Sequence, residues 1–261
     1  MKKNIGIVIT FFCIFIGLFL LVNKKKTSSD QILTVGMMSG WAPFMTINGQ
    51  GEYEGFDVDV AQELAARMGK SVVIQDLGSL ASCFIALEQG MVDMVMSGLD
   101  ITKKRQESYA MIYYTGENVT QLSLAFWNVV PQSVQTIDDL SYIPNAIVCV
   151  ESGSAQEKFL DKYPVITKKY MNSILDSLLD IRFGKSLAVL LESRIACRLQ
   201  KKNSELALLS VPLSTDFQMY GCGIAIQKNQ GAFIQSVEKI IREMREDGTV
   251  KTLEIKWQLE E

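Results

Sequence analysis

Residues 92–105, VDMVMSGLDITKKR, contain one complete unit of an alternating fold. Residues 92–96 are a short, mostly apolar run of the length of a buried strand. Thr102 is a residue type that caps helices, so a short helix is expected over residues 103–107. A buried strand, a glycine-containing loop and a helix in this order are typical of α/β folds.

Strands and helices are expected to alternate on both sides of this unit. Further strands are predicted over residues 32–37, 71–74, 122–127, 146–150, 165–170, 187–191, 206–211 and 223–226. Helices are predicted over residues 59–68, 82–89, 155–160, 173–183, 194–199 and 232–245, with a last short helix ending at Trp257. The order β-α-β-α-β occurs twice, which predicts an α/β fold with a mainly parallel sheet in each half. Ligands of such sheets bind where strands end, so the loops after Met37, Met96, Val150 and Leu191 are the candidate binding loops.

The charges of the chain are distributed unevenly. The first 26 residues hold five lysines and no acidic residue, which leaves 21 basic against 29 acidic residues and a net charge of −8. This acidity argues against nucleic-acid binding, which needs a basic surface. The sequence contains no histidine, which removes the commonest general base and a common zinc ligand. We therefore expect no catalytic residue, no metal and no cofactor.

The five cysteines include no C-x-x-C pair, which argues against a metal or thioredoxin-like motif. Cys83, Cys149, Cys197 and Cys222 have apolar neighbours and are expected to be buried. A disulfide among them is the alternative in an oxidising compartment, and the sequence alone does not pair them.

Residues 5–22 form an uncharged run of 18 residues with lysines on both sides. This length is at the lower limit for spanning a bilayer. A signal peptide and a retained anchor both fit it, although no small-x-small cleavage pattern follows. Residues 1–30 are therefore predicted to be a signal peptide or membrane anchor plus a tether. The remaining chain would be periplasmic, secreted or tethered outside the cytoplasm.

Arg105 is the candidate for binding a ligand's carboxylate. It falls in the first turn of the predicted helix, where a cation opposes the helix dipole at a cost of about 0.3–1 kcal/mol. A guanidinium group binds a carboxylate through two parallel hydrogen bonds. The alternative is a solvated surface arginine beside Lys103 and Lys104. If Arg105 serves only the ligand, alanine there abolishes binding and leaves the melting temperature of the ligand-free protein nearly unchanged.

The other candidate loops carry residues with both a structural and a functional interpretation. Gly98 allows the backbone to approach a ligand closely. Ser154 and Glu157 match a capping box, whose spare N–H groups could also meet a ligand. Glu192 is either a first-turn carboxylate of the next helix or a ligand contact. Trp41 is either a core residue or an apolar wall of the site.

Segments spread along the chain match one family pattern: Gly36, Trp41-Ala42-Pro43-Phe44, Gly55-Phe56-Asp57-Val58-Asp59-Val60-Ala61, Asp93, Ser97-Gly98, Ile101-Thr102, Arg105, Gly153-Ser154, Gln156-Glu157, Gly184-Lys185-Ser186, Leu191-Glu192 and Asp247-Gly248-Thr249. They resemble the periplasmic solute-binding proteins that capture polar amino acids, known as bacterial solute-binding protein family 3. The resemblance runs from about Ile32 to Trp257 in the expected order. Within the family it is closest to chlamydial arginine- or glutamine-type binding proteins.

This resemblance implies a two-lobed periplasmic-binding-protein fold of type II, in which two crossing strands act as a hinge. One lobe would comprise residues 31–125 and 222–261, and the other residues 126–221, with crossings near residues 124–126 and 222–225. Trp41 would stack on the ligand side chain, opposite Leu80. The positions that would contact the ligand are Trp41, Leu80, Ser97, Gly98, Asp100, Arg105, Glu151, Ser154, Ala155 and Glu192.

The resemblance also implies roles for the charged groups. Arg105 would hold the α-carboxylate together with the N–H groups of Gly98 and Ala155, and Glu192 would bind the α-ammonium group. Three positions depart from the family: Ala155, Asp100 and Met38. Ala155 replaces the usual threonine, and Asp100 stands where a small hydroxyl residue is usual.

The ligand's side chain stays open between two classes. Glu151 lies where selectivity is often set, whereas Met38 occupies a position that is often acidic in binders of basic ligands. If Asp100, Glu151 and Glu192 all face the cleft, a cationic side chain such as that of arginine is favoured. If Asp100 and Glu192 share the ammonium group, a neutral ligand such as glutamine fits equally well.

The expected function is that of an extracytoplasmic binding protein, which delivers a polar L-amino acid to an ABC importer. Its partners would be the free amino acid and the permease subunits in the inner membrane. It would act as a monomer. One alternative is a dehydratase-like enzyme on the same scaffold, with Glu192 or Asp100 as proton donor. The other is a ligand-sensing module that works through a partner chain.

Overall fold

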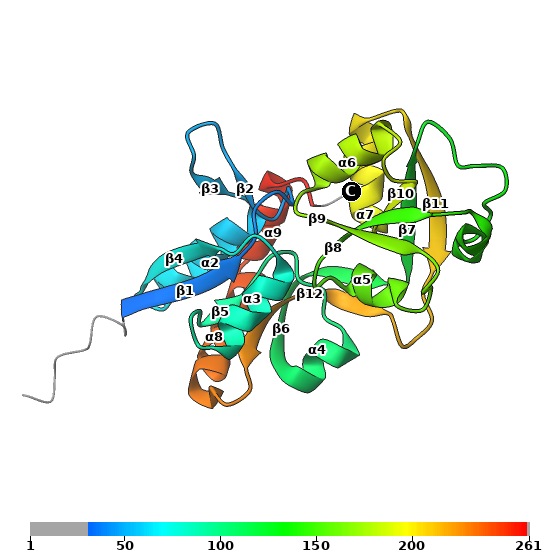
Figure 1. Cartoon of the computed structure of the whole chain (residues 1–261). Helices are drawn as coiled ribbons and strands as arrows, with labels where there is room; N and C mark the ends of the chain where they lie inside the picture. The colour runs from blue at the N-terminus through cyan, green and yellow to red at the C-terminus, as the bar shows by residue number, and fades with distance from the viewer. Residues whose placement is uncertain (1–30, 260–261) are drawn as a thin grey trace, which may run out of the picture.

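The computed structural model describes residues 31–259 of the chain. Figure 1 shows two lobes, one holding the first strands and the last helices and the other holding the middle of the chain. The signal peptide or anchor predicted in residues 1–30 lies outside the described residues. Within residues 31–259, no helix combines the length and the apolar character needed to cross a membrane.

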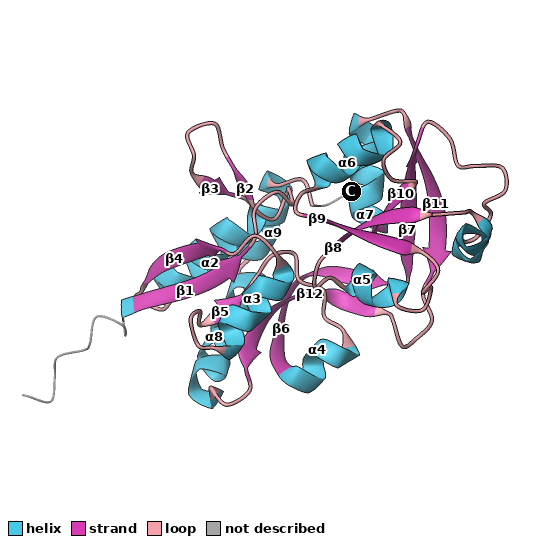
Figure 2. Ribbon diagram, in the orientation of Figure 1, coloured by secondary structure: helices cyan, strands magenta, loops and turns pink. Residues whose placement is uncertain are grey.

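The first lobe is built on a five-stranded sheet with the order β4-β1-β5-β12-β6. Its strands are β1 (Ile32–Met37), β4 (Ser71–Asp76), β5 (Met94–Val95), β6 (Tyr109–Val119) and β12 (Met219–Gln227). Its helices are α2 (Phe56–Arg67), α3 (Leu80–Glu88), α4 (Lys103–Ser108), α8 (Gly231–Glu246) and α9 (Thr249–Lys256). A small hairpin of β2 (Thr46–Ile47) and β3 (Tyr53–Glu54) extends from this lobe (Figure 2). The helices α2 and α8 pack in one apolar cluster with the sheet and α3 packs in another, as in a layered α/β fold.

The second lobe has a sheet with the order β11-β7-β10-β8-β9. Its strands are β7 (Gln121–Trp127), β8 (Ile147–Glu151), β9 (Thr167–Met171), β10 (Ala188–Glu192) and β11 (Leu206–Pro212). Its helices are α5 (Ala155–Leu160), α6 (Ile174–Arg182), α7 (Ser193–Lys202) and the 3-10 helix η2 (Ile137–Tyr142). Two apolar clusters again flank the sheet, one with α5 and one with α6 and α7.

The predicted α/β class is confirmed, but each sheet is mixed rather than mainly parallel. The strands β4-β1-β5 and β9-β8-β10 are parallel. All antiparallel pairings of the two sheets involve β7 or β12, the strands that follow the two passages of the chain between the lobes. β7 and β12 each enter their sheet from the other lobe. They run opposite to strands whose connections stay within one lobe, and this direction explains the mixed order.

The antiparallel ribbon of β6 and β12 links the two lobes. The paired residues Val119 and Met219 belong to the buried core of the second lobe. The paired residues Ile112 and Ile224 belong to the core of the first. One continuous pair of strands therefore enters both cores, which is the arrangement that a hinge between lobes requires.

This ribbon differs from the sequence-based expectation in one strand. The strand β6, residues 109–119, was not predicted, although tyrosines favour strands in residues 109–114. The predicted lobe boundaries at residues 125/126 and 221/222 stay a prediction. β7 already belongs to the second sheet from Gln121, and β12 to the first from Met219.

The cysteines of the described residues are free thiols. Cys83, Cys149 and Cys222 are buried as expected, whereas Cys197 is exposed. The expectation of a buried Cys197 is wrong because α7 is strongly amphipathic and Cys197 lies on its solvent-facing side, next to the buried Ala196.

Candidate functional site

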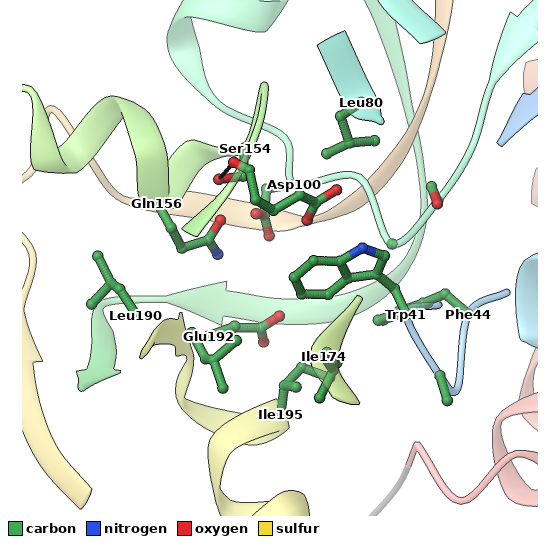
Figure 3. Close-up of a pocket in the computed structure, with 15 residues that line it drawn as sticks. Trp41, Phe44, Leu80, Asp100, Ser154, Gln156, Ile174, Leu190, Glu192 and Ile195 are labelled. Atoms are coloured by element: carbon green, nitrogen blue, oxygen red, sulfur yellow. Dashed lines mark hydrogen bonds between the residues drawn. The ribbon is translucent and has the colours of Figure 1, made fainter. Parts of the chain in front are cut away.

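A pocket lies between the two lobes and is lined by residues of both. The loops after β1, β5, β8 and β10, the four candidate binding loops, all contribute to it. Eight of the ten predicted site residues line the pocket, and many of them are seen in Figure 3: Trp41, Leu80, Ser97, Gly98, Asp100, Glu151, Ser154 and Glu192. Arg105 and Ala155 are not among the lining residues.

Seven further residues complete the lining: Ala42, Phe44, Gln156, Ile174, Leu190, Leu191 and Ile195. Phe44 shares a loop with Trp41, and Gln156 directly follows Ala155 at the start of α5, so a wider selection around these residues would have found them. Leu190, Ile174 and Ile195 come from β10, α6 and α7, and in sequence they resemble any other core residue.

The lobes contact each other at the edge of this pocket. The Ile174 N–H donates to the Gly40 carbonyl at 3.2 Å, and the Arg105 Nη2 donates to the Gly153 carbonyl at 2.9 Å. The Cα of Gly153 faces the backbone of Ala81, because a Cβ built on it would lie 2.6 Å from the Ala81 nitrogen. The structure therefore shows the lobes closed on one another.

Trp41 stands at the centre of the pocket in Figure 3. Its loop is held by a hydrogen bond from the Phe44 N–H to the Trp41 carbonyl at 3.0 Å. The Trp41 Nε1 is buried and has no hydrogen-bond partner within residues 31–259. A buried donor without a partner is unfavourable. The indole ring contributes an apolar surface to the pocket lining.

Three carboxyl groups line the pocket: those of Asp100 and Glu192, which are buried, and that of Glu151, which is half-buried. Burial and the neighbouring Glu192 charge raise the pKa of Asp100 to about 7, against the lowering effect of Arg105. Burial raises the pKa of Glu151 to about 8, again opposed by Arg105. None of the described residues that line the pocket is a lysine or an arginine. The pocket surface is therefore acidic, and a cation inside it would favour the ionised carboxylates.

Arg105 is buried beside the pocket rather than in its wall. The predicted helix cap is confirmed, because the Thr102 hydroxyl accepts from the Arg105 N–H at 3.2 Å. The guanidinium donates from Nη1 to the Asp100 carbonyl at 2.7 Å and from Nη2 to the Gly153 carbonyl. Its carbon lies 5.3 Å from the centre of the Phe84 ring. The interpretation of a solvated surface arginine is therefore wrong, and the carboxylate-binding role stays a prediction.

Gly98 has a left-handed backbone, with φ +58°, and packs against the Phe44 ring. Its N–H donates to the Asp57 Oδ2 at 2.6 Å, so this donor is already satisfied within the protein. Asp57 is fully buried and also accepts from the Tyr114 hydroxyl at 2.7 Å. Asp57 thus connects α2, the loop after β5 and the linking strand β6. The sequence analysis did not identify this positioning role.

Asp57 should make the protein more stable in mild acid. Burial raises the pKa of its carboxyl from 3.8 to about 7, although hydrogen bonds from Tyr114 and Gly98 lower it. The folded state then holds a proton that the unfolded state releases, so this contribution is fully present below the unfolded pKa and is lost as the pH rises through 7. We expect about 1.4 kcal/mol for each pH unit in this window, and a melting temperature several degrees higher at about pH 5 than at about pH 8. Thermal unfolding of the wild type and Asp57→Asn should show a shallower profile for the variant, and a flat wild-type profile would contradict the assignment.

Glu192 and Ser154 line the pocket and also make contacts that support the local structure. Glu192 ends β10 directly before α7, makes no side-chain cap, and accepts from the Arg194 Nε at 2.7 Å. Ser154 caps α5 by accepting from the Glu157 N–H at 3.0 Å. The returning half of the predicted capping box is shifted by one residue, because the Glu157 carboxylate accepts from Gly153 rather than Ser154. Ala155 is the first residue of α5, between two lining residues.

Two α/β lobes, a linking strand pair and a shared pocket define a two-lobed ligand-binding protein. The family model for bacterial extracellular solute-binding proteins, family 3, matches residues 33–260, and the chain belongs to this family. The resemblance and the fold expected from it are thereby confirmed.

Curated relatives of the chain are named as binding proteins. The probable ABC transporter arginine-binding protein ArtJ of Chlamydia trachomatis is 28% identical over 232 residues, which covers 89% of this chain and 88% of that protein. The L-cystine-binding protein TcyJ of Escherichia coli is 25% identical over 241 residues, covering 91% and 85%.

Solved structures show the same fold. The P235GK mutant of ArgBP from T. maritima has a TM-score of 0.76 and 27% identity, and the match covers 89% of this chain and 97% of that one. An ancestral amino acid-binding protein, described as a precursor of cyclohexadienyl dehydratase, has a TM-score of 0.74 and 25% identity, covering 88% and 96%.

Proposed function

We propose that this protein is the ligand-binding component of an ABC importer and that its ligand is a polar L-amino acid. The observation that carries the proposal is the convergence of four strand-end loops from two lobes on one pocket in a chain of this family. The names of its relatives, which include arginine- and cystine-binding proteins, support an amino acid as ligand. The three carboxyl groups of the lining favour a basic amino acid over an acidic one.

The contacts suggest how an amino acid is held. Opening of the lobes would break the bond between the Arg105 Nη2 and the Gly153 carbonyl, because these groups belong to different lobes. The freed Nη2 would donate a hydrogen bond to the ligand's α-carboxylate. The Glu192 carboxylate, fixed through one oxygen by Arg194, would bind the α-ammonium group. Trp41 would cover the ligand's side chain as the lobes close.

Partners and location follow from the same proposal. The family is extracellular, and the protein would present its closed, loaded form to permease subunits as a monomer. We infer a location outside the cytoplasm, reached through a signal peptide or held by an anchor in the first residues. The pocket lining contains carboxyl groups but no histidine, and the relatives cited are binding proteins, which supports binding rather than dehydratase chemistry.

Calorimetry of residues 27–261 against the twenty amino acids and ornithine tests the function. We expect tight binding of one class, with Kd on the order of 1 μM or below, and an unchanged ligand recovered afterwards. Binding of none of these compounds would overturn the proposal, and a chemically converted ligand would favour the enzyme.

A further inference from the structure

The carboxylate of Glu192, the proposed partner of the ligand's α-ammonium group, is buried in the pocket wall. Figure 3 shows it directed toward the ring of Trp41. The buried carboxyl of Asp100 is close enough for the charge of Glu192 to act on it. A buried carboxylate beside another acid is unfavourable unless a cation and hydrogen bonds accompany it. Glu192 therefore needs a cationic partner within the protein that leaves the place of the ligand free.

Arg194 meets this requirement from the side away from the ligand. Its Nε donates to the Glu192 Oε1 at 2.7 Å. Arg194 is not among the residues that line the ligand pocket, but it lines the two neighbouring hollows, which share Phe44 with the pocket. The guanidinium therefore compensates the buried charge without occupying the space of the ligand. The second oxygen of the carboxylate can then accept from an ammonium group.

The other end of this guanidinium lies against the linking ribbon of β6 and β12. A Cβ built on Gly116 of β6 would be 3.0 Å from the Arg194 Nη2, so a glycine at this position gives the guanidinium its room. Gly116 has a left-handed backbone, with φ +85°, and falls at a register shift of the ribbon. Groups close to a hinge move least when lobes open. Arg194 is therefore placed to keep Glu192 oriented in the open form, which is the form that first meets a ligand.

We propose that Arg194 is a positioning residue, which holds the Glu192 carboxylate in place against the linking ribbon for the ligand's α-ammonium group. The inference rests on the proposed function, because it concerns the ammonium contact of the same site. It adds a residue that neither the family resemblance nor the pocket lining identifies. An ion pair that only stabilised α7 would support all ligands alike. A positioning role favours ligands that carry an α-ammonium group, because their partner is already oriented.

Calorimetry with two matched pairs tests the proposal: L-arginine against δ-guanidinovalerate, and L-glutamine against glutaramate. Each pair differs only by the α-ammonium group. We expect the wild type to bind the amino acid of at least one pair more tightly than its analogue. In Arg194→Gln this preference should fall by about ten-fold or more, the size of one charge-assisted hydrogen bond, through weaker binding of the amino acid.

Arg198→Gln is the matched control for this variant. Arg198 stands one turn later on α7 and lines one of the same hollows, but it donates to the Trp257 carbonyl instead of to Glu192. Its replacement should leave the preference unchanged. Arg194→Lys retains the charge without a second nitrogen for the ribbon, so we expect this variant to lower the preference as well. Full recovery of the preference with lysine would show that charge alone suffices and would overturn the positioning role.

The outcomes separate this inference from the function on which it rests. If the wild type prefers the amino acid and Arg194→Gln keeps the same preference, the inference is overturned and the proposed function stands. An equal loss of affinity for both members of a pair has the same meaning, because it shows a purely structural ion pair. If the wild type shows no preference within either pair, or binds neither amino acid, the ammonium contact assigned to Glu192 fails together with the inference.

Discussion

Arg105→Ala is expected to lower the free energy of unfolding of the ligand-free protein by about 3 kcal/mol and to abolish L-amino-acid binding. The guanidinium is buried and donates to the carbonyls of Asp100 and Gly153. Its removal leaves these acceptors without their donors and removes the positive charge that lowers the pKa of Asp100 and Glu151. This expectation replaces the one drawn from the sequence, in which the ligand-free melting temperature stays nearly unchanged.

Chemical denaturation gives the free energy of unfolding, and calorimetry gives the affinity. Arg242→Ala is a suitable control because Arg242 is exposed on α8, away from the pocket. It should change stability by less than about 0.5 kcal/mol. An Arg105→Ala protein that is as stable as the wild type would show that the two carbonyl contacts contribute little. Retained amino-acid binding in that variant would contradict the proposed carboxylate contact.

Gly153→Ala is expected to weaken ligand binding by about a hundred-fold or more, because it prevents the lobes from closing. An added Cβ would lie 2.6 Å from the Ala81 nitrogen, and this nitrogen belongs to the backbone of the opposite lobe. Opening the lobes relieves the clash, so the ligand-free protein should lose only the cost of a left-handed alanine, about 1–2 kcal/mol. Small-angle scattering should show no ligand-induced decrease in the radius of gyration.

Gly184→Ala is the matched control for this variant. Gly184 has a similar left-handed backbone, φ +66° against +83° for Gly153, but a Cβ there meets no atom within 4 Å. Both variants should therefore lose similar stability, and only Gly153→Ala should lose affinity and compaction. Equal affinities of the two variants would show that the contact between Gly153 and Ala81 does not limit closure.

Much of the fold was predictable because its signals are local. The strand β1 has the predicted bounds, and the helix starts at Thr102, Ser154 and Ser173 are marked by capping side chains. The strand β6 was missed because its role is to pair with β12, about a hundred residues later in the chain. The mixed sheet order was missed for the same reason, since strand direction depends on which segments return from the other lobe.

The candidate site was likewise predictable only where its signals are local. Apolar runs and glycine-containing loops identified the strand ends, so the sequence alone located Trp41, Asp100, Glu151 and Glu192 at strand ends or in the loops after them, which meet at one pocket. Such patterns extend over only a few residues and need no partner. The same local patterns identified Arg105 as a candidate, without showing whether its guanidinium would contact a ligand.

The partners of each group depend on the tertiary structure. The Arg105 guanidinium reaches a carbonyl 48 residues away, and the Gly98 N–H reaches a carboxylate 41 residues away. These partners meet because helices and sheets pack and the lobes close. Local sequence patterns contain no information about such contacts. In the packed structure Arg105 lies outside the pocket wall, and three carboxyl groups are part of it. Hydrogen-bond partners and local charge are properties of the assembled interior, and they determine which ligand the pocket accepts.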